Sequence, residues 1–184
     1  MIIAVWIFIL VLAIAAIVLA ILASRPGLHW LVAPSAVPVV LAIALWAAGV
    51  PQPHPVIGSV LVVVFLVLGV VAGSPVVGLV LRLATRGTVS LGTHGGILVR
   101  DAASPIPDRE ILRGGATIGY LERVALIGAV LAGQPAAVAI IVAVKGLGRF
   151  SELENEQARE RFIIGTLASL VWAGACVAAI GVPW

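Results

Sequence analysis

Charged residues are scarce in this chain of 184 residues: Asp, Glu, Lys and Arg together make up only 10% of it. Soluble domains carry about 25% charged residues, so this deficit excludes an ordinary soluble domain. The hydrophobic share is 62%, and the mean hydropathy is +1.23. These values predict a single integral membrane domain that covers residues 1–184.

Residues that carry chemistry are also few. The one cysteine, Cys176, has no partner for an internal disulfide and lies in an apolar run, which predicts a buried small side chain. The histidines His29, His54 and His94 are scattered, and no metal-ligand, dinucleotide or phosphate-loop spacing occurs. Basic stripes with interleaved aromatic residues are absent as well. The sequence therefore predicts no metal, no cofactor, no nucleic-acid partner and no catalytic residue, and it argues against an enzyme without excluding one.

Apolar runs fill most of the remaining chain. Two of them, on either side of a Gly-Gln-Pro turn at residues 133–135, are shorter than the roughly 20 residues that a helix needs to cross a bilayer. We therefore expect an all-α membrane bundle of about six membrane helices, or of four plus a re-entrant helical hairpin, with a small irregular cytoplasmic segment. The six runs are Ile2–Ala23, Trp30–Val50, Val56–Gly73, Ile118–Ala132, Ala136–Arg149 and Phe162–Ile180.

These runs divide the chain into four parts. Pro75 is expected to break or kink the third helix, because proline removes a backbone donor. Ser151, with Glu154 three residues later, forms a capping box that predicts the N-cap of the last helix. The parts are three membrane helices in 1–86, a polar cytoplasmic segment in 87–117, the helical hairpin in 118–150, and an amphipathic start with the last membrane helix in 151–184.

The polar segment shows only weak patterns. Thr88–Leu91 and Ile97–Arg100 are expected to pair as a small β-hairpin, and Asp108–Arg113 is expected to form one helical turn. Its arginines could contact lipid headgroups or another anion, or the segment could be a solvated loop. The candidate contacts, which include two arginines just before the segment, are Arg82, Arg86, Arg100, Arg109 and Arg113.

Basic residues fall in alternate connections between the runs. Lys or Arg follows the first, third and fifth runs, whereas the connections after the second and fourth runs, and both termini, contain neither. The positive-inside rule then places both termini outside the cytoplasm. We expect a multi-pass protein of the bacterial cytoplasmic membrane, with lipids as partners and a second copy or another membrane protein as an open alternative. A hairpin that re-enters from the cytoplasm leaves the same charge pattern, so the rule does not distinguish the two helix counts.

Two opposite charges lie at matching positions in the hairpin. Glu122 is 12 residues before Gln134 and Lys145 is 11 residues after it, so in antiparallel helices both lie roughly 17 Å from the turn. Arg149 follows Lys145 by one turn. Charges inside a membrane are costly unless they pair, so we expect Glu122 to pair with Lys145, Arg149 or both, in a cluster that also includes Arg123.

This charge cluster has two interpretations. Lys145 is the only lysine among 11 basic residues, and an ammonium that can lose its proton favours an ion or proton relay, or an anion site. Alternatively, the pair is a structural clasp, with Arg123 and Arg149 extending to lipid headgroups.

The last third of the chain contains a spaced pattern: GG-xx-IG-x-LER, then K-xxx-RF-x-E, then F-x-IGT-LxS. This pattern resembles the C-terminal part of a family of uncharacterised bacterial multi-pass membrane proteins, over Gly114–Ile180. The resemblance implies placement in a membrane and assigns no activity. The matching residues are Gly114, Gly115, Ile118, Gly119, Leu121, Glu122, Arg123, Lys145, Arg149, Phe150, Glu152, Phe162, Ile164, Gly165, Thr166 and Ser169.

Three functions remain open from the sequence. An accessory or scaffolding membrane protein is favoured, because no catalytic pattern occurs. A small transporter or channel would use the Glu122/Lys145 pair. A membrane enzyme acting on a lipid or polyprenyl phosphate would use the arginine-rich polar segment.

Overall fold

The computed structural model describes residues 2–25, 27–84, 97–99, 109–111, 115–148 and 156–181. These residues form an all-α bundle with a very small two-stranded sheet, as the composition predicts. Four helical segments are long and apolar enough to cross a membrane: Ile2–Ala23, His29–Ala47, Pro55–Ala84 and Arg159–Ile180. The elements are α1 (Ile2–Ala23), a 3-10 helix η1 (His29–Ser35), α2 (Ala36–Ala47), α3 (Pro55–Ala84), β1 (Ile97–Val99), β2 (Arg109–Ile111), α4 (Gly115–Leu131), α5 (Ala137–Gly148) and α6 (Glu156–Ile180).

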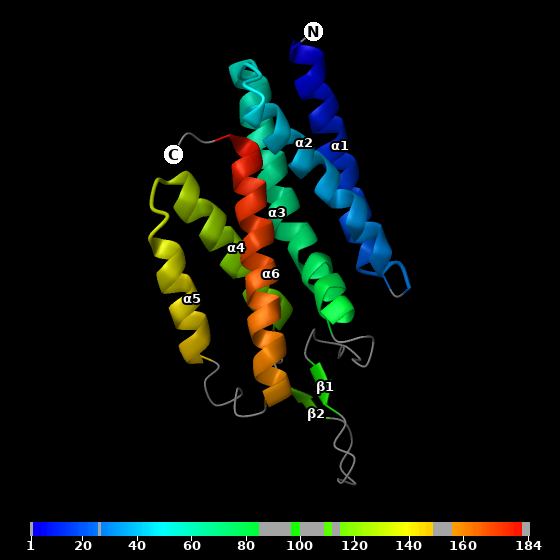
Figure 1. Cartoon of the computed structure of the whole chain (residues 1–184), viewed down its shortest axis with the longest axis vertical. Coiled ribbons are helices and arrows are strands. Elements are labelled where there is room, and N and C mark those ends of the chain that lie inside the picture. Colours follow the sequence, from blue (N-terminus) through cyan, green and yellow to red (C-terminus); the bar gives the residue numbers. More distant parts are fainter. Residues whose placement is uncertain are drawn as a thin grey trace.

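The four long segments run up and down between two ends of the molecule (Figure 1). The start of α1, the α2–α3 connection and the end of α6 lie at one end, which we call the terminal end. The end of α1, the end of α3, both strands and the start of α6 lie at the other. This second end is called the basic end, because it includes the exposed or half-buried residues Arg25, Arg82, Arg159 and Arg161.

Helix α1 has a small-residue face and a bulky face. Its buried positions recur every three or four residues and become alanines after Ile9, namely Ala13, Ala16, Ala20 and Ala23. Alanine lets helix backbones approach closely in a membrane, and this face packs against α3 and η1. Exposed residues such as Phe8 and Val11 cover the opposite face, where lipid would contact them.

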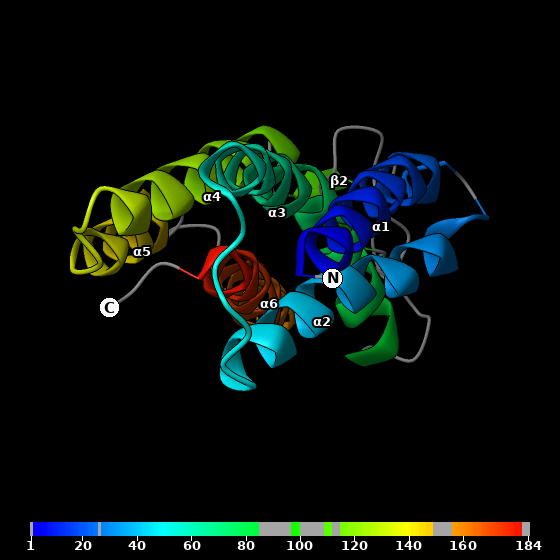
Figure 2. The same ribbon diagram turned by 90° about the horizontal axis from the view of Figure 1, so that it is seen from above.

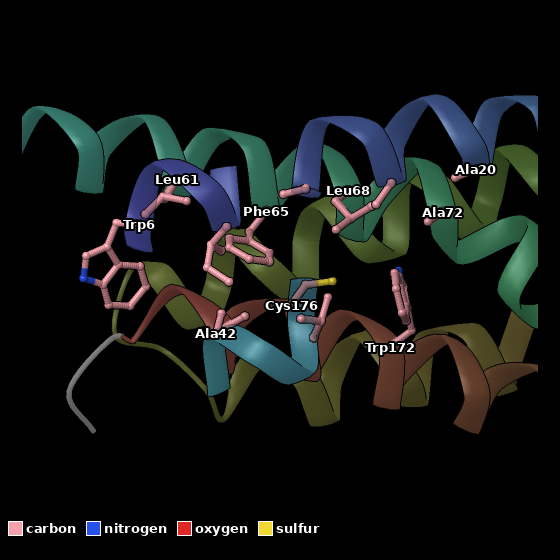
Figure 3. Packing of buried hydrophobic residues seen from close by; sticks show 14 residues of the cluster. Trp6, Ala20, Ala42, Leu61, Phe65, Leu68, Ala72, Trp172 and Cys176 are labelled. Atoms are coloured by element: carbon pink, nitrogen blue, oxygen red, sulfur yellow. The ribbon is translucent and has the colours of Figure 1, made fainter. Parts of the chain in front are cut away.

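Helices α3 and α6 form the centre of the bundle, with the other helices arranged around them (Figure 2). Phe65 and Leu68 of α3 are fully buried and lie towards Cys176 and Trp172 of α6 (Figure 3). The absence of a side chain at Gly69 is required here, because a Cβ would lie 2.9 Å from Ile127 Cδ1 and 3.2 Å from Cys176 Cβ. The predicted burial of Cys176 is confirmed.

The prolines in two of the long segments have different effects on helix structure. The second crossing begins as η1, which contains Pro34, and becomes α-helical only at Ala36. In contrast, of the break or kink expected at Pro75, the break is wrong, since α3 continues through this residue to Ala84. Proline removes the helical donor to the carbonyl four residues earlier, and neighbouring groups can compensate inside a membrane protein. The carbonyl that Pro75 leaves without its helical donor is that of Val71, and Arg123 of α4 donates a hydrogen bond to the adjacent Val70 carbonyl, as described below.

Two tryptophans join the helices at the terminal end. Trp6 Nε1 of α1 donates to the Pro51 carbonyl at 3.1 Å, and Trp46 Nε1 of α2 donates to the Ala179 carbonyl of α6 at 3.0 Å. The two rings contact each other with centroids 4.9 Å apart. These contacts connect α1, α2, the α2–α3 connection and α6 at one level.

The predicted hairpin is formed by α4 and α5, and its turn is a Schellman motif. Gly133 adopts φ +72°, while its N–H donates to Val130 O and the N–H of Gln134 donates to Ala129 O. The 17 residues of α4 and 12 of α5 give lengths of about 26 and 18 Å, against a hydrocarbon core about 30 Å thick. The alternative of four crossings plus a short hairpin therefore fits better than six crossings.

The secondary structure of the polar segment differs from the expected one. Strand β1 pairs antiparallel with β2, so that Ile97 faces Ile111 and Val99 faces Arg109. The expected helical turn at Asp108–Arg113 is therefore wrong, because its central residues extend to complete a ladder. Thr88–Leu91 and the predicted cap Ser151 lie outside the described residues.

Candidate functional site

Helix α4 directs two neighbouring charges to different helices. Consecutive residues on an α-helix project roughly 100° apart, so Glu122 and Arg123 cannot share one partner face. Glu122 contacts α5, whereas Arg123 contacts α3 and α6. One pair of adjacent residues thus joins α4 to three other helices.

The ion pair predicted between Glu122 and Lys145 is present. Lys145 Nζ donates to Glu122 Oε2 at 2.5 Å, and each side chain is only 16% exposed. Lys145 Nζ also lies 5.6 Å from the ring centroid of Phe162 in α6, a distance at which an aromatic face attracts a cation. The pair therefore connects the two arms of the hairpin and brings α5 close to α6.

Arg123 does not extend to lipid headgroups, and this expectation is wrong. Arg123 is only 2% exposed, and its Nε donates to the Val70 carbonyl at 3.0 Å. Nη2 donates to Ser74 Oγ at 2.8 Å and Nη1 to Ser169 Oγ at 3.3 Å. A buried guanidinium needs its donors satisfied, and three oxygen atoms on α3 and α6 supply this, so the side chain turns inward.

Two glycines make room for the guanidinium. A Cβ at Gly73 would overlap Cδ and Nε of Arg123, and a Cβ at Gly119 would lie 3.1 Å from its Nη1. Gly69 and Gly73, about one helical turn apart on α3, thus make room for different neighbours. Gly69 admits the side chains of Ile127 and Cys176, and Gly73 admits Arg123.

A small cavity adjoins the ion pair. Side chains from α4, α5 and α6 line it, including Glu122, Lys145 and Thr166, and its volume is about 10 Å³. Two buried oxygen atoms at this place, Glu122 Oε1 and Thr166 Oγ1, form no hydrogen bond with any described group. The ion pair thus has one carboxylate oxygen available for a further polar contact.

The chemistry available to the cluster is electrostatic. Its described charged groups are one carboxylate and two cations, which gives a net positive charge. Within the described residues no group of three His, Cys, Asp or Glu side chains could hold a metal ion. The arrangement can hold helices together, and it can retain a small polar molecule beside Glu122.

Of the other predicted site residues, the structure describes the positions of Arg82 and Arg109 only. Arg82 is exposed in the last turn of α3 at the basic end, as a headgroup contact requires. Arg109 belongs to β2. Arg86, Arg100, Arg113 and Arg149 lie outside the described residues.

Sequence reasoning missed Ser74 as a partner of Arg123. Ser169, the hydroxyl partner on α6, appeared in the sequence analysis only as a residue of the spaced pattern. The available signal was a hydroxyl residue within an apolar run, in the turn beside Gly73 and Pro75. Such hydroxyls often bond across helices in membranes.

No protein-family model, curated protein or solved structure matches this chain.

Proposed function

We propose that the protein is an accessory or scaffolding membrane protein that presents the α4–α5 hairpin to another membrane protein. The observation that carries this proposal is the outer face of α5. No residue of α5 is buried in this chain, although the Glu122–Lys145 ion pair fixes its position. A short helix held in a defined place but left outside the core is suited to contact with a partner.

The composition of this face favours a helix as the partner. Ile140, Val144 and Leu147 recur at helical spacing and are 66%, 63% and 76% exposed. Ala139 and Ala143 lie on the exposed side beside them. Helix pairs in membranes form around small residues flanked by apolar ones, because dispersion contacts then extend over the backbone.

Site-specific photocrosslinking in the native membrane tests this proposal. A photoreactive residue at Val144 should produce an adduct with one defined protein. The same residue at Val11, which is exposed on α1, serves as a matched lipid-facing control. Lipid adducts alone at both positions would contradict the accessory role, and an adduct with a second copy of the chain would redirect it to self-association.

A small transporter or channel is the second candidate, and one observation favours it. Glu122 uses only one of its carboxylate oxygens in the ion pair, while the other lines the cavity. A carboxylate and an ammonium that exchange a proton could form a relay. Proteoliposomes should then show a pH-dependent flux that disappears in Lys145→Ala, whereas an equal flux in protein-free liposomes would reject this candidate.

We also propose the membrane and the orientation. Arg25, Arg82, Arg159 and Arg161 lie at one end, which supports a cytoplasmic basic end and an extracytoplasmic terminal end. Placement in a bacterial cytoplasmic membrane, and kinship with the multi-pass family resembled by Gly114–Ile180, rest on the sequence pattern. The enzyme alternative rests on a polar segment that lies mostly outside the described residues.

A further inference from the structure

The cavity beside the ion pair has the size of one small molecule. Its volume of about 10 Å³ matches the roughly 10–15 Å³ that a single water molecule requires. A polar group must also line such a cavity, because apolar cavities of this kind remain dry. Here the lining includes Glu122, Arg123, Lys145, Thr166 and Ser169.

Two of these residues have hydrogen-bonding capacity that no other described group uses. Thr166 is 9% exposed, and its Oγ1 has no hydrogen-bond partner within the described part of the chain. The same holds for Oε1 of Glu122. Leaving such atoms buried without partners is unfavourable, so a ligand that satisfies both would be retained.

The chemistry of the two atoms identifies the ligand. A carboxylate oxygen only accepts hydrogen bonds, whereas a hydroxyl both donates and accepts. A cation would meet the two positive side chains Arg123 and Lys145, and an anion would meet the free oxygen of Glu122. A neutral molecule that donates on one side and accepts on the other fits both.

We propose that this cavity binds one water molecule. The water donates a hydrogen bond to Glu122 Oε1 and accepts one from the hydroxyl of Thr166. It thereby joins α4 to α6 at the level where Glu122 already joins α4 to α5. This inference is independent of the proposed partner of α5, because all of its groups belong to this chain.

Water-edited solid-state NMR of the full chain in lipid bilayers tests the proposal. Magnetisation should pass from water to the Glu122 carboxyl carbon and to the Thr166 side chain in the unsubstituted protein. Thr166→Val, which keeps the shape but removes the hydroxyl, should reduce the transfer to Glu122 several-fold. Thr166→Ser should restore it. Ser59→Ala serves as a control, because Ser59 is exposed and bonds only within α3, to Pro55 O.

Three results would overturn the proposal. One is the absence of water transfer to Glu122 in the unsubstituted protein. Another is equal transfer in the unsubstituted chain and in Thr166→Val, which would mean that the water reaching Glu122 does not use Thr166. The third is a saturable shift of the Glu122 and Thr166 signals on addition of chloride, which would identify an anion site. If Thr166→Val does not fold, the unsubstituted protein and Thr166→Ser still decide the result.

Discussion

At the scale of the residue, the cluster uses arginine and lysine for different tasks. Arg123 meets three oxygen atoms on two helices, which suits a planar guanidinium with five donors. Lys145 meets one carboxylate oxygen, which suits a compact ammonium. A lysine at position 123 would carry its three donors on a single nitrogen, whereas the three oxygen atoms are reached by the separate Nε, Nη1 and Nη2 atoms of Arg123.

Gly73→Ala should destabilise the protein, because its Cβ would overlap the stem of Arg123. Overpacking of this kind costs about 1–3 kcal/mol. Gly78→Ala in the same helix is the matched control, since a Cβ there meets no atom within 4 Å. Thermal unfolding in detergent should show a lower Tm for Gly73→Ala and an unchanged or higher Tm for Gly78→Ala, and equal Tm values would contradict this account of the contact.

Glu122→Gln should also destabilise the protein, because it leaves the Lys145 ammonium without its carboxylate. The expected loss is about 2 kcal/mol, as for a hydrogen bond between charged groups. The exposed Glu160 provides a control variant, Glu160→Gln, which should change little. The double variant that exchanges the charges, Glu122→Lys with Lys145→Glu, should regain part of the lost stability in unfolding measurements. If its loss of stability equalled the sum of the losses of the two single variants, a direct clasp would be contradicted.

The sequence was sufficient to predict one of the two contacts in this cluster. Glu122 and Lys145 lie nearly the same number of residues from one turn. The rise per residue of an α-helix converts these counts into nearly equal distances from that turn. Arg123 could not be placed in this way. Its inward direction depends on how α4 lies against α3 and α6, and on the room left by Gly73, which are tertiary properties.

At the scale of the element, the hairpin depends on how α4 ends. Gly133 takes the left-handed conformation that closes the Schellman motif. Gly133→Ala should cost about 1–2 kcal/mol, because a Cβ is strained at positive φ. Gly128→Ala, one turn earlier in the helix, should be neutral or stabilising, since its Cβ would meet open space and alanine favours helix. Calorimetry would contradict this explanation if the two variants had the same Tm.

Elements were predictable where they depend on local sequence. Apolar length indicated all four long segments. The continuation of α3 through Pro75 was not predictable, because a helix that is packed on several sides can retain its course despite one missing hydrogen bond. The pairing of β1 with β2 joins residues 10 to 14 positions apart, and local strand propensity does not determine such a register.

At the scale of the whole molecule, the bundle has a basic end and a terminal end. Four crossings would place the start of α1 and the end of α6, which lie at the same end of the molecule, on the same side of the membrane. A cysteine introduced at Gln52, in a background where Cys176 is replaced by alanine, should therefore react with an impermeant thiol reagent applied outside intact cells. A cysteine replacing Arg25 should react only after permeabilisation. The opposite pattern would reverse the orientation.

The central claim is that Arg123 fixes the α4–α5 hairpin against the four-crossing bundle. The most direct measurement is the distance between spin labels at Ala136, beside the hairpin turn, and Gln52, between α2 and α3, with Cys176 replaced by alanine. The protein with Arg123 should give one narrow distance distribution in bilayers. Arg123→Ala should give a broad or multi-component distribution, and Arg123→Lys should not restore the narrow one. An equally narrow distribution in Arg123→Ala, at the same distance, would contradict the account.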